Sequence, residues 1–366
     1  MSDVYVQLDV KDIEDILGCI NGKDLNGDYF KVKDNSQKLV KDEFAKFVNG
    51  EISQRRKKSS ISNLREFHNY IKLTLITNIV NLYKFQNKSK QVNLLDIAVG
   101  RGGDIFKWNV AGISNVFGFD KSRDSIESIN PFNQGARERY KKSKSNLKVN
   151  IEFEVGDATR ETPGLTEKII LFANKNKIKG FDIMSCQFAM HYFFQNEIAL
   201  HNVFKMYSLF IKPGGYFIGT SVDGNKISEL LNSNTRFEST LLNITKKYKS
   251  IKPTKPYNNE YTFKINDSID QGMYFNTLGE STEYLVNTEV LKTVAKQYGF
   301  EPVYINFFQP IPNTFNYTSS NNFISFSEIY RLYELGQSSW KKGNPLTPDE
   351  LVLNNLYTTF VFQKIK

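Results

Sequence analysis

A glycine-rich segment between an apolar strand and a helix constrains the fold of this chain more than any other feature of its sequence. Residues 92–96 predict a buried strand, Gly100, Gly102 and Gly103 follow it, and residues 104–110 predict the start of a helix. Glycines permit a tight turn and a close approach of the backbone to a ligand. A helix N-terminus offers free N–H groups and partial positive charge to a carboxylate or phosphate. The segment therefore predicts a nucleotide-type ligand at the end of a parallel strand.

Strand and helix patterns alternate through most of the chain. A long amphipathic helix is predicted over 61–84, because its apolar residues recur every three or four positions. Further strands are predicted at 116–120, 151–155, 181–186, 215–220, 303–308 and 357–364, and a further helix at 288–298. Such a series predicts an α/β fold, with a mostly parallel central sheet and helices on both faces.

The composition excludes several classes of protein. Of 366 residues, 40% are apolar and 24% charged, which is ordinary for a globular protein and rules out a disordered chain, collagen or a coiled coil. Two cysteines without a C-x-x-C pair argue against a disulfide scaffold or a zinc knuckle. No apolar run approaches the roughly 20 residues of a membrane helix, and the first residues lack a signal peptide. We expect a reduced, intracellular protein.

The charge balance leaves two interpretations open. The chain has 48 basic and 39 acidic residues, a net charge of +9. A basic surface attracts phosphate polymers such as RNA, but a lysine-rich, solvated surface explains the same excess. The basic run over 137–148 carries the same two alternatives, an RNA track or a solvated loop.

Two segments depart from the alternating pattern. Residues 1–54 form a predicted N-terminal extension of unknown role, and residues 55–366 form the predicted main domain. Residues 221–282 are rich in Asn, Ser, Thr and Lys; we expect a helix near 226–232, an irregular stretch and a strand at 261–265. This segment is predicted to be an insertion, or lid, over the ligand edge of the sheet.

Three acidic residues near the strand ends help to identify the type of ligand. Asp120 ends the second predicted strand, 20 residues after Gly100, where a carboxylate can accept both ribose hydroxyls of NAD or S-adenosylmethionine (SAM). Asp96 ends the first strand, and Ala98 stands at the first glycine position of G-x-G-x-x-G, which favours SAM. Asp157 follows the third strand, where it could accept the adenine amino group or cap a helix.

Four blocks occur together in one order. They are Asn69-Tyr70-Ile71-Lys72, the glycine loop through Asp104 with Lys107-Trp108, Cys186-Gln187-Phe188-Ala189-Met190-His191-Tyr192, and Lys212-Pro213-Gly214-Gly215. From about residue 55 to 366 the sequence resembles eukaryotic and large-DNA-virus mRNA cap guanine-N7 methyltransferases. The block ending in His191-Tyr192 is its most specific element. The resemblance implies a Rossmann-like, class I SAM-dependent methyltransferase fold.

The resemblance also implies site residues and ligands. SAM would be the methyl donor, S-adenosylhomocysteine the product, and no metal would take part. The implied SAM-binding residues are Lys72, Asp96, Ala98, Gly100, Asp120, Asp157 and Gln187. The implied cap- and RNA-binding residues are Asn69, Arg101, Lys107, Arg139, Phe188, His191, Tyr192, Pro213, Glu283 and Tyr357. His191, Tyr192 and Glu283 would be catalytic through positioning and electrostatics.

The implied reaction is attack of the guanine N7 lone pair on the SAM methyl group, in line with the leaving sulfur. N7 carries no proton, so no general base is needed, and positioning with exclusion of water should supply the catalysis. Two alternatives remain. One is a SAM-dependent methyltransferase acting on another substrate. The other is a catalytically weak cap- or RNA-binding module, which Ala98 in place of the usual glycine keeps open. From sequence alone, His191 and Tyr192 could also be a helix start packed on the sheet.

The expected partner is 5′-capped RNA, and the expected role is mRNA capping. No Lys-x-Asp-Gly motif of a guanylyltransferase occurs, so cap formation would need another chain or a further segment of a larger capping enzyme. A stimulatory subunit is a further expected partner. Few arginines among many lysines, together with His68-Asn69-Tyr70, favour a viral origin. The expected location is the nucleus or cytoplasm, or the host cytoplasm or virion for a viral protein.

Overall fold

The computed structural model describes residues 59–131, 133–250, 255–267, 280–303, 322–336 and 344–365. Chain contacts divide the protein into two units, 1–51 and 52–366, and all the described residues belong to the second. The predicted N-terminal extension and most of the predicted strand over 303–308 lie outside the described residues.

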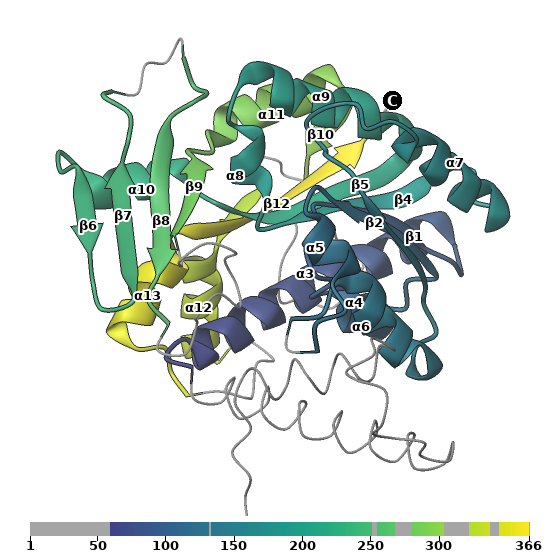
Figure 1. Cartoon of the computed structure of the whole chain (residues 1–366), viewed down its shortest axis with the longest axis horizontal. Helices are drawn as coiled ribbons and strands as arrows, with labels where there is room; N and C mark the ends of the chain where they lie inside the picture. Colours follow the sequence, from purple (N-terminus) through teal and green to yellow (C-terminus); the bar gives the residue numbers. More distant parts are fainter. Residues whose placement is uncertain are drawn as a thin grey trace, which may run out of the picture. The chain divides into compact units, whose positions relative to one another are not determined.

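An eight-stranded central sheet organises this unit (Figure 1). Its order is β10-β12-β5-β4-β1-β2-β3, with β11 also paired to β12. The five strands from β3 to β5 run parallel, and β12 runs antiparallel to β5, β10 and β11. The strands are β1 (Asn93–Ile97), β2 (Asn115–Asp120), β3 (Asn150–Val155), β4 (Phe181–Gln187), β5 (Ile211–Val222), β10 (Phe300–Pro302), β11 (Phe323–Ser325) and β12 (Tyr357–Lys364). This order confirms the predicted Rossmann-like fold with a mostly parallel sheet.

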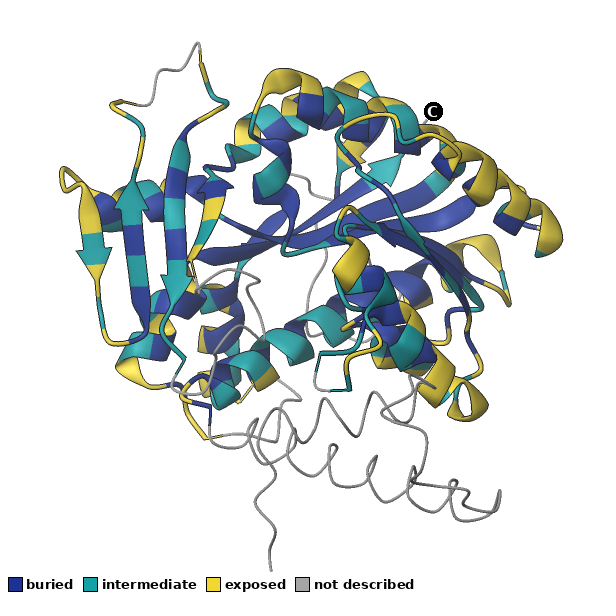
Figure 2. Cartoon of the chain, viewed as in Figure 1, coloured by how far each residue is buried: buried dark blue, intermediate teal, exposed yellow. Residues whose placement is uncertain are grey.

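Helices cover both faces of the sheet and bury its strands (Figure 2). The long predicted helix is α3 (Ser62–Asn87), whose Phe67, Ile71, Leu75 and Ile79 are completely buried. With α3 on one face lie α4 (Ile105–Ala111), α6 (Ala136–Ser143), α12 (Phe326–Glu334) and α13 (Pro348–Asn355). The other face carries α7 (Leu165–Lys175), α8 (Met190–Phe193), α9 (Glu197–Tyr207) and α11 (Thr288–Gln297). Among the described residues, the remaining α-helices are α5 (Arg123–Glu127) and α10 (Gly224–Leu231).

A second, four-stranded antiparallel sheet occupies most of the predicted insertion. Its strands are β6 (Arg236–Glu238), β7 (Leu242–Lys246), β8 (Glu260–Ile265) and β9 (Glu280–Tyr284). The expectation of an irregular stretch before the strand at 261–265 was wrong, because β6 and β7 lie there. Along β7 and β8, buried residues such as Ile244 and Phe263 alternate with more exposed polar ones. The polar composition that predicted irregularity therefore belongs to the solvated face of a sheet.

One further boundary differs from the prediction. The insertion begins later than residue 221, because β5 continues to Val222, where it pairs with Tyr357 of β12. Of the strand expected at 303–308 only Val303 belongs to the described residues, and it directly follows the short strand β10 (Phe300–Pro302). Pairing with β12 sets its position, since Phe300 lies opposite Lys364, and the alternating sequence pattern does not reveal which residues find a partner.

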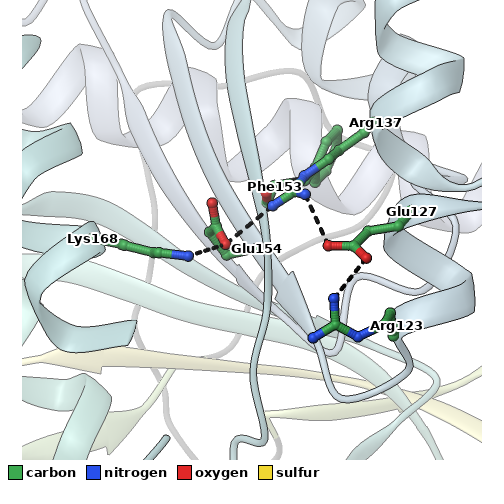
Figure 3. Close-up of polar contacts among 6 residues, drawn as sticks. All are labelled: Arg123, Glu127, Arg137, Phe153, Glu154 and Lys168. Atoms are coloured by element: carbon green, nitrogen blue, oxygen red, sulfur yellow. Dashed lines mark hydrogen bonds and ion pairs between the residues drawn. The ribbon is translucent and has the colours of Figure 1, made fainter. Parts of the chain in front are cut away.

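The edge strand β3 is covered by a side chain of α6 (Figure 3). Arg137 donates to the Phe153 carbonyl oxygen at 2.9 Å and pairs with Glu127 at 3.0 Å and Glu154 at 3.1 Å. Lys168 also reaches Glu154, at 2.6 Å. An occupied edge resists pairing with another chain. Arg137 is therefore engaged in the fold, and much of the basic run expected to be a solvated loop or an RNA track lies on a helix.

Candidate functional site

The ends of the parallel strands bring the predicted SAM-binding residues together. Ala98 and Gly100 follow β1, Asp120 ends β2, and Gln187 ends β4. Because β1 pairs in parallel with both β2 and β4, these ends share one edge of the sheet. In open α/β sheets ligands bind outside this carboxyl edge. The glycine loop and its acidic neighbour thus lie where a nucleotide-type ligand is expected.

The loop after β1 is held by Asp120. One carboxylate oxygen accepts from the Gly100 N–H at 2.8 Å, and the other accepts from the Ser122 N–H at 2.8 Å. Burial raises the pKa of Asp120, and these two bonds oppose the rise. Gly100 has φ +55°, and a Cβ there would meet no atom within 4 Å, so the loop faces open space. Each Asp120 oxygen keeps a lone pair for a ligand hydroxyl.

Asp96 is a buried carboxyl with an unused oxygen. Asp96 lies in β1 and its side chain is buried. Its Oδ1 has no hydrogen-bond partner among the described residues. Burial raises its pKa well above the usual range, while Ser185 and Lys72 act in the opposite direction. Buried polar groups are nearly always paired. An orphaned carboxyl oxygen beside the glycine loop therefore points to a ligand donor, such as an ammonium group.

Two lysines converge on one buried carboxylate. Lys72 Nζ lies 2.6 Å from Asp104 Oδ1, and Lys107 Nζ lies 2.8 Å from the same oxygen. Burial alone would raise the pKa of Asp104, but the two ammonium groups prevail and hold it at about 2. Lys72 Nζ also lies 5.5 Å from the centre of the Phe188 ring. Asp104 thus joins a residue predicted to bind SAM to one predicted to bind the cap.

Gln187 and Asp157 line the same edge. Gln187 accepts from the Thr220 hydroxyl at 3.1 Å and donates to Ser185 at 3.2 Å. Asp157 accepts from the Thr159 N–H at 2.9 Å and pairs with Arg160 at 2.9 Å. The helix-cap alternative for Asp157 is wrong, because the next helix, α7, begins only at Leu165 with Gly164 as its cap.

His191 faces Glu283 across a buried contact. His191 lies on α8, Glu283 lies on β9, and the two side chains are 6% and 4% exposed. His191 Nε2 and Glu283 Oε1 are 3.8 Å apart, and neither ring nitrogen has a hydrogen-bond partner among the described residues. Burial lowers the pKa of His191, although Glu283 opposes this, so the ring is neutral at pH 7. Core packing alone does not explain two unpaired nitrogens.

Glu283 is oriented by two hydroxyl groups of its own sheet. Tyr261 of β8 donates to Glu283 Oε2 at 2.8 Å, and Ser281 donates to Oε1 at 2.7 Å. Burial, together with Glu283, raises the pKa of Tyr261 well above its usual range, so the phenol stays a donor. Each carboxylate oxygen keeps further acceptor capacity. The arrangement suits a planar ligand with adjacent N–H donors.

An aromatic wall links the two parts of the site. The Phe188 ring lies 5.2 Å from the Tyr357 ring, edge to face, and stacks on His68 at 5.6 Å. Phe188 has φ +56°, and its N–H donates to the Thr220 carbonyl oxygen at 2.9 Å. Burial raises the pKa of Tyr357, and Glu283 adds to the rise. The wall therefore runs from the Lys72 side of the site to Glu283.

Tyr192 presents its ring to a cation. Lys121 Nζ lies 5.1 Å from the ring centre, and the rings of His191 and Tyr192 are 4.1 Å apart. Lys121 directly follows Asp120, so the cation approaches from the side of the glycine loop. An aromatic face attracts a positive charge within about 6 Å. Tyr192 can thus stabilise a cationic ligand between the two halves of the site.

Three other residues predicted to bind the cap lie on different elements: Asn69 on α3, Arg101 in the glycine loop and Arg139 on α6. Asn69 lies three residues before Lys72 on α3, hence on the same face of the helix. Arg101, in the loop, donates to the Asn133 carbonyl oxygen at 2.8 Å and pairs with Asp124. Arg139 lies on α6 and is half-buried.

The structure places Pro213 away from the other predicted cap-binding residues. It is exposed near the start of β5, whereas Thr220, near the end of the strand, contacts Gln187 and Phe188. Seven residues of extended strand separate them by roughly 23 Å. The Pro-Gly-Gly turn therefore lies toward the opposite edge of the sheet from the site, and the site end of β5 is at Thr220 to Val222.

Sequence reasoning missed several residues of the site. Asp104 directly follows the glycine loop, and the structure shows its importance because both Lys72 and Lys107 contact it. Tyr261 and Ser281 orient Glu283, and Lys121 covers Tyr192. An acid at a helix start is usually a cap, so only the acid's adjacency to the loop could have pointed to Asp104. No sequence signal identifies the two hydroxyls.

Two absences concern only the described residues. Among them no group of three or more His, Cys, Asp or Glu side chains is arranged to hold a metal ion. No helix in the same part of the chain combines the length and apolar character needed to cross a membrane.

Several known proteins are similar to this chain in sequence. The model of the mRNA (guanine-N(7))-methyltransferase domain matches residues 30–365. The mRNA cap guanine-N(7) methyltransferase 1 of Arabidopsis thaliana is 28% identical over 341 residues, covering 90% of this chain and 82% of that protein. The probable mRNA-capping enzyme of Acanthamoeba polyphaga mimivirus is 28% identical over 305 residues, covering 79% of this chain and 24% of that protein. Among solved structures, the CcbJ methyltransferase from Streptomyces caelestis is 11% identical with a TM-score of 0.45, covering 80% of this chain and 90% of that one.

Proposed function

The chain belongs to the mRNA (guanine-N(7))-methyltransferase family, and on that premise we propose that it methylates N7 of the guanine in the 5′ cap of RNA, with SAM as donor. One observation supports this most directly. The buried, neutral His191 and the hydroxyl-oriented Glu283 lie beside Tyr192, near Asp120 at the carboxyl edge of the sheet. A cofactor edge and a polar pocket for a flat base thus adjoin each other.

The residues at the sheet edge fit SAM. When bound, SAM supplies an electrophilic methyl group on a positively charged sulfur. Lys72 would hold its carboxylate, and the unused Oδ1 of Asp96 fits its ammonium group. Asp120 would accept the ribose hydroxyls while it keeps the Gly100 loop in place. Asp157, Ala98 and Gln187 complete the proposed set.

The second half of the site fits guanine. Glu283 would accept from the N1–H and the amino group, because Tyr261 and Ser281 hold its carboxylate in place without using all its lone pairs. His191 would hydrogen-bond the base edge through its unpaired nitrogens. Because N7 has no proton to lose, His191 does not need to act as a general base, and a neutral histidine suits this reaction.

Charge moves from the donor sulfur to the guanine ring during the transfer, and the site provides for positive charge at both ends. Tyr192 offers an aromatic face on which Lys121 already rests. Glu283 would stabilise the cationic methylated base. Phe188 and Tyr357 would exclude water along the wall of the pocket. Arg101, Lys107 and Arg139 would contact the phosphates, and Asn69 the adjoining ribose or phosphate.

The RNA must arrive already capped. We propose that removal of the terminal phosphate from the RNA 5′ triphosphate and the guanylyl transfer belong to another chain or to a further segment, and that capped RNA is the substrate. The mimivirus relative, named a probable mRNA-capping enzyme, is about four times as long as the part that matches.

The decisive test is the position of the methyl group. The full chain would be incubated with methyl-labelled SAM and RNA carrying GpppG or GpppA, and the digested cap would be analysed. We expect label in N7-methylguanosine, and a Tyr192→Ala variant should lose most turnover while it still binds SAM. Label on a ribose, on an internal base or on no RNA at all would refute the proposal.

A further inference from the structure

The N-terminus of α3 is completed by carboxylates from distant parts of the chain. Its capping residue, Ile61, provides no side-chain hydrogen bond, and the first turn of the helix contains no acidic residue. Instead Asp267 accepts from the Ser60 N–H at 3.0 Å, and Glu350 accepts from the Leu64 N–H at 3.0 Å. A helix N-terminus favours negative charge. Asp267 therefore places a negative charge just before α3, beside Ser60, and Glu350 places a second one at the first turn of the helix.

Asp267 also holds two serine hydroxyls. Ser59 Oγ donates to Asp267 Oδ2 at 2.6 Å, and Ser60 Oγ donates to Oδ1 at 3.2 Å. With the Ser60 N–H, three hydrogen bonds join this carboxylate to the two residues that precede the Ile61 cap of α3. We call these three bonds the Asp267 tether.

The tether connects the two halves of the proposed site. Asp267 lies two residues beyond the end of β8, which pairs Tyr261 with Glu283 of β9. At the other side of the tether, α3 carries Lys72. The sheet that orients Glu283 is thus fastened to the helix that positions Lys72.

The sequence before the tether is strongly basic. Arg55, Arg56, Lys57 and Lys58 directly precede Ser59 and Ser60. Many serine kinases select substrates by charge pattern, with acidic groups that accept basic residues before the target hydroxyl. Ser59 is 6% exposed, whereas Ser60 is exposed. Of the two hydroxyls, Ser60 is the one that a kinase can reach.

We propose that Ser60 is a phosphorylation site for a basophilic serine kinase, and that its phosphate opens the Asp267 tether. In this step Ser60 Oγ forms a bond to the γ-phosphorus of MgATP, the bond from that phosphorus to the bridging oxygen breaks, and ADP leaves. The hydroxyl proton passes to the kinase. A phosphate adds a charge of about −1.5 to −2.

The phosphate on Ser60 would displace the Asp267 carboxylate from its hydrogen bonds rather than bind beside it. Phosphate next to the carboxylate is repelled, but phosphate at a helix N-terminus is stabilised. The phosphate would therefore displace Asp267 from the Ser60 N–H, beside the N-terminus of α3, and release the end of β8. The sheet carrying Glu283 would lose its fastening to α3, while the Gly100–Asp120 contact of the SAM edge would remain. This consequence rests on the proposed function.

The test is phosphorylation of the full chain followed by kinetics. The protein would be treated with MgATP and the catalytic subunit of cyclic-AMP-dependent protein kinase, and the modified residue located by mass spectrometry. We expect one phosphate, on Ser60, and a rise in KM for GpppG-capped RNA of about tenfold. The Kd of SAM, measured by calorimetry, should stay unchanged.

Two variants separate the steps. Ser60→Ala should take up no phosphate and keep the KM of the untreated protein within about twofold after kinase treatment, since the bonds of the Ser59 hydroxyl and the Ser60 N–H to Asp267 remain. Asp267→Asn should raise KM without phosphate. The proposal is overturned by phosphate on Ser59 alone, by no phosphate on the native chain, or by a phosphorylated Ser60 with unchanged KM. Failure of the untreated protein to methylate N7 would instead reject the proposed function.

Discussion

Replacing Asp104 by asparagine tests the central electrostatic contact of the site. The carboxylate lies 2.6 and 2.8 Å from two ammonium groups, and its pKa falls from an ordinary 3.8 to about 2. A shift of this size corresponds to roughly 2 kcal/mol of stability at neutral pH. Asparagine also leaves Lys72 and Lys107 facing each other uncompensated. We therefore expect Asp104→Asn to lower the free energy of unfolding by about 3 kcal/mol.

The loss should be visible in stability and in cofactor binding. For a chain of this size 3 kcal/mol corresponds to a Tm lower by about 5 °C. The Kd of SAM, measured by calorimetry, should rise about tenfold, because Lys72 is no longer held in place. A matched control is Glu289→Gln, which removes an exposed pair with Lys292. Such surface pairs contribute about 0–1 kcal/mol, so the control should change neither quantity measurably.

The effect of Asp104→Asn on stability should depend on pH, and the pKa of Asp104 sets the direction of that dependence. A carboxyl with a depressed pKa in the folded state contributes its full stability above the unfolded value and loses it as the pH falls through the folded value. The difference between Asp104→Asn and the unmodified protein should thus be constant above about pH 4 and shrink toward pH 2. Urea denaturation at several pH values measures it. A difference of less than 1 kcal/mol at pH 7, or an unchanged Kd of SAM, would refute this reasoning.

Three further substitutions test single contacts. Ala98→Gly should raise the free energy of unfolding by about 1 kcal/mol, because alanine at φ +58° is strained; lower stability in urea denaturation would show that the methyl group contributes packing instead. Glu283→Gln should raise KM for capped RNA at least tenfold and leave the Kd of SAM unchanged in calorimetry; equal losses would contradict a base-facing role. Lys121→Met should free the Tyr192 ring and tighten SAM, which is cationic, about threefold relative to S-adenosylhomocysteine; an unchanged calorimetric ratio would show that Tyr192 does not face the sulfur.

The central sheet and α3 could be predicted because their signals are local. Helix α3 was predicted from apolar residues at helical spacing, and the strand over 357–364 coincides with β12. The glycine loop between β1 and α4 identifies its own geometry, since Gly100 and Gly102 both adopt positive φ. Period and turn chemistry are properties of a few neighbouring residues, so one sequence is sufficient to find them.

The second sheet and its role could not be predicted in the same way. The Tyr261–Glu283 contact joins residues 22 positions apart, and the Ser59–Asp267 contact joins residues 208 apart. Neither contact leaves a periodic trace, because each depends on which strands pair and which loops meet. Without the family resemblance, Glu283 would have passed for an ordinary surface acid, although the structure buries it.

The strained residues explain why local rules fail where the site begins. Ala98 follows β1 at φ +58°, and Phe188 follows β4 at φ +56°, although a bulky residue there is a true outlier. At Phe188 the backbone is fixed by Thr220 Oγ1, which accepts from its N–H at 3.1 Å. The reversed turn directs the ring onto Tyr357 and His68 instead of continuing the strand. Glycine would remove the strain and also the ring that forms the wall. Such strain persists where the surroundings enforce it and the function uses the result, so the residue that propensity disfavours at this turn is the one that the site requires.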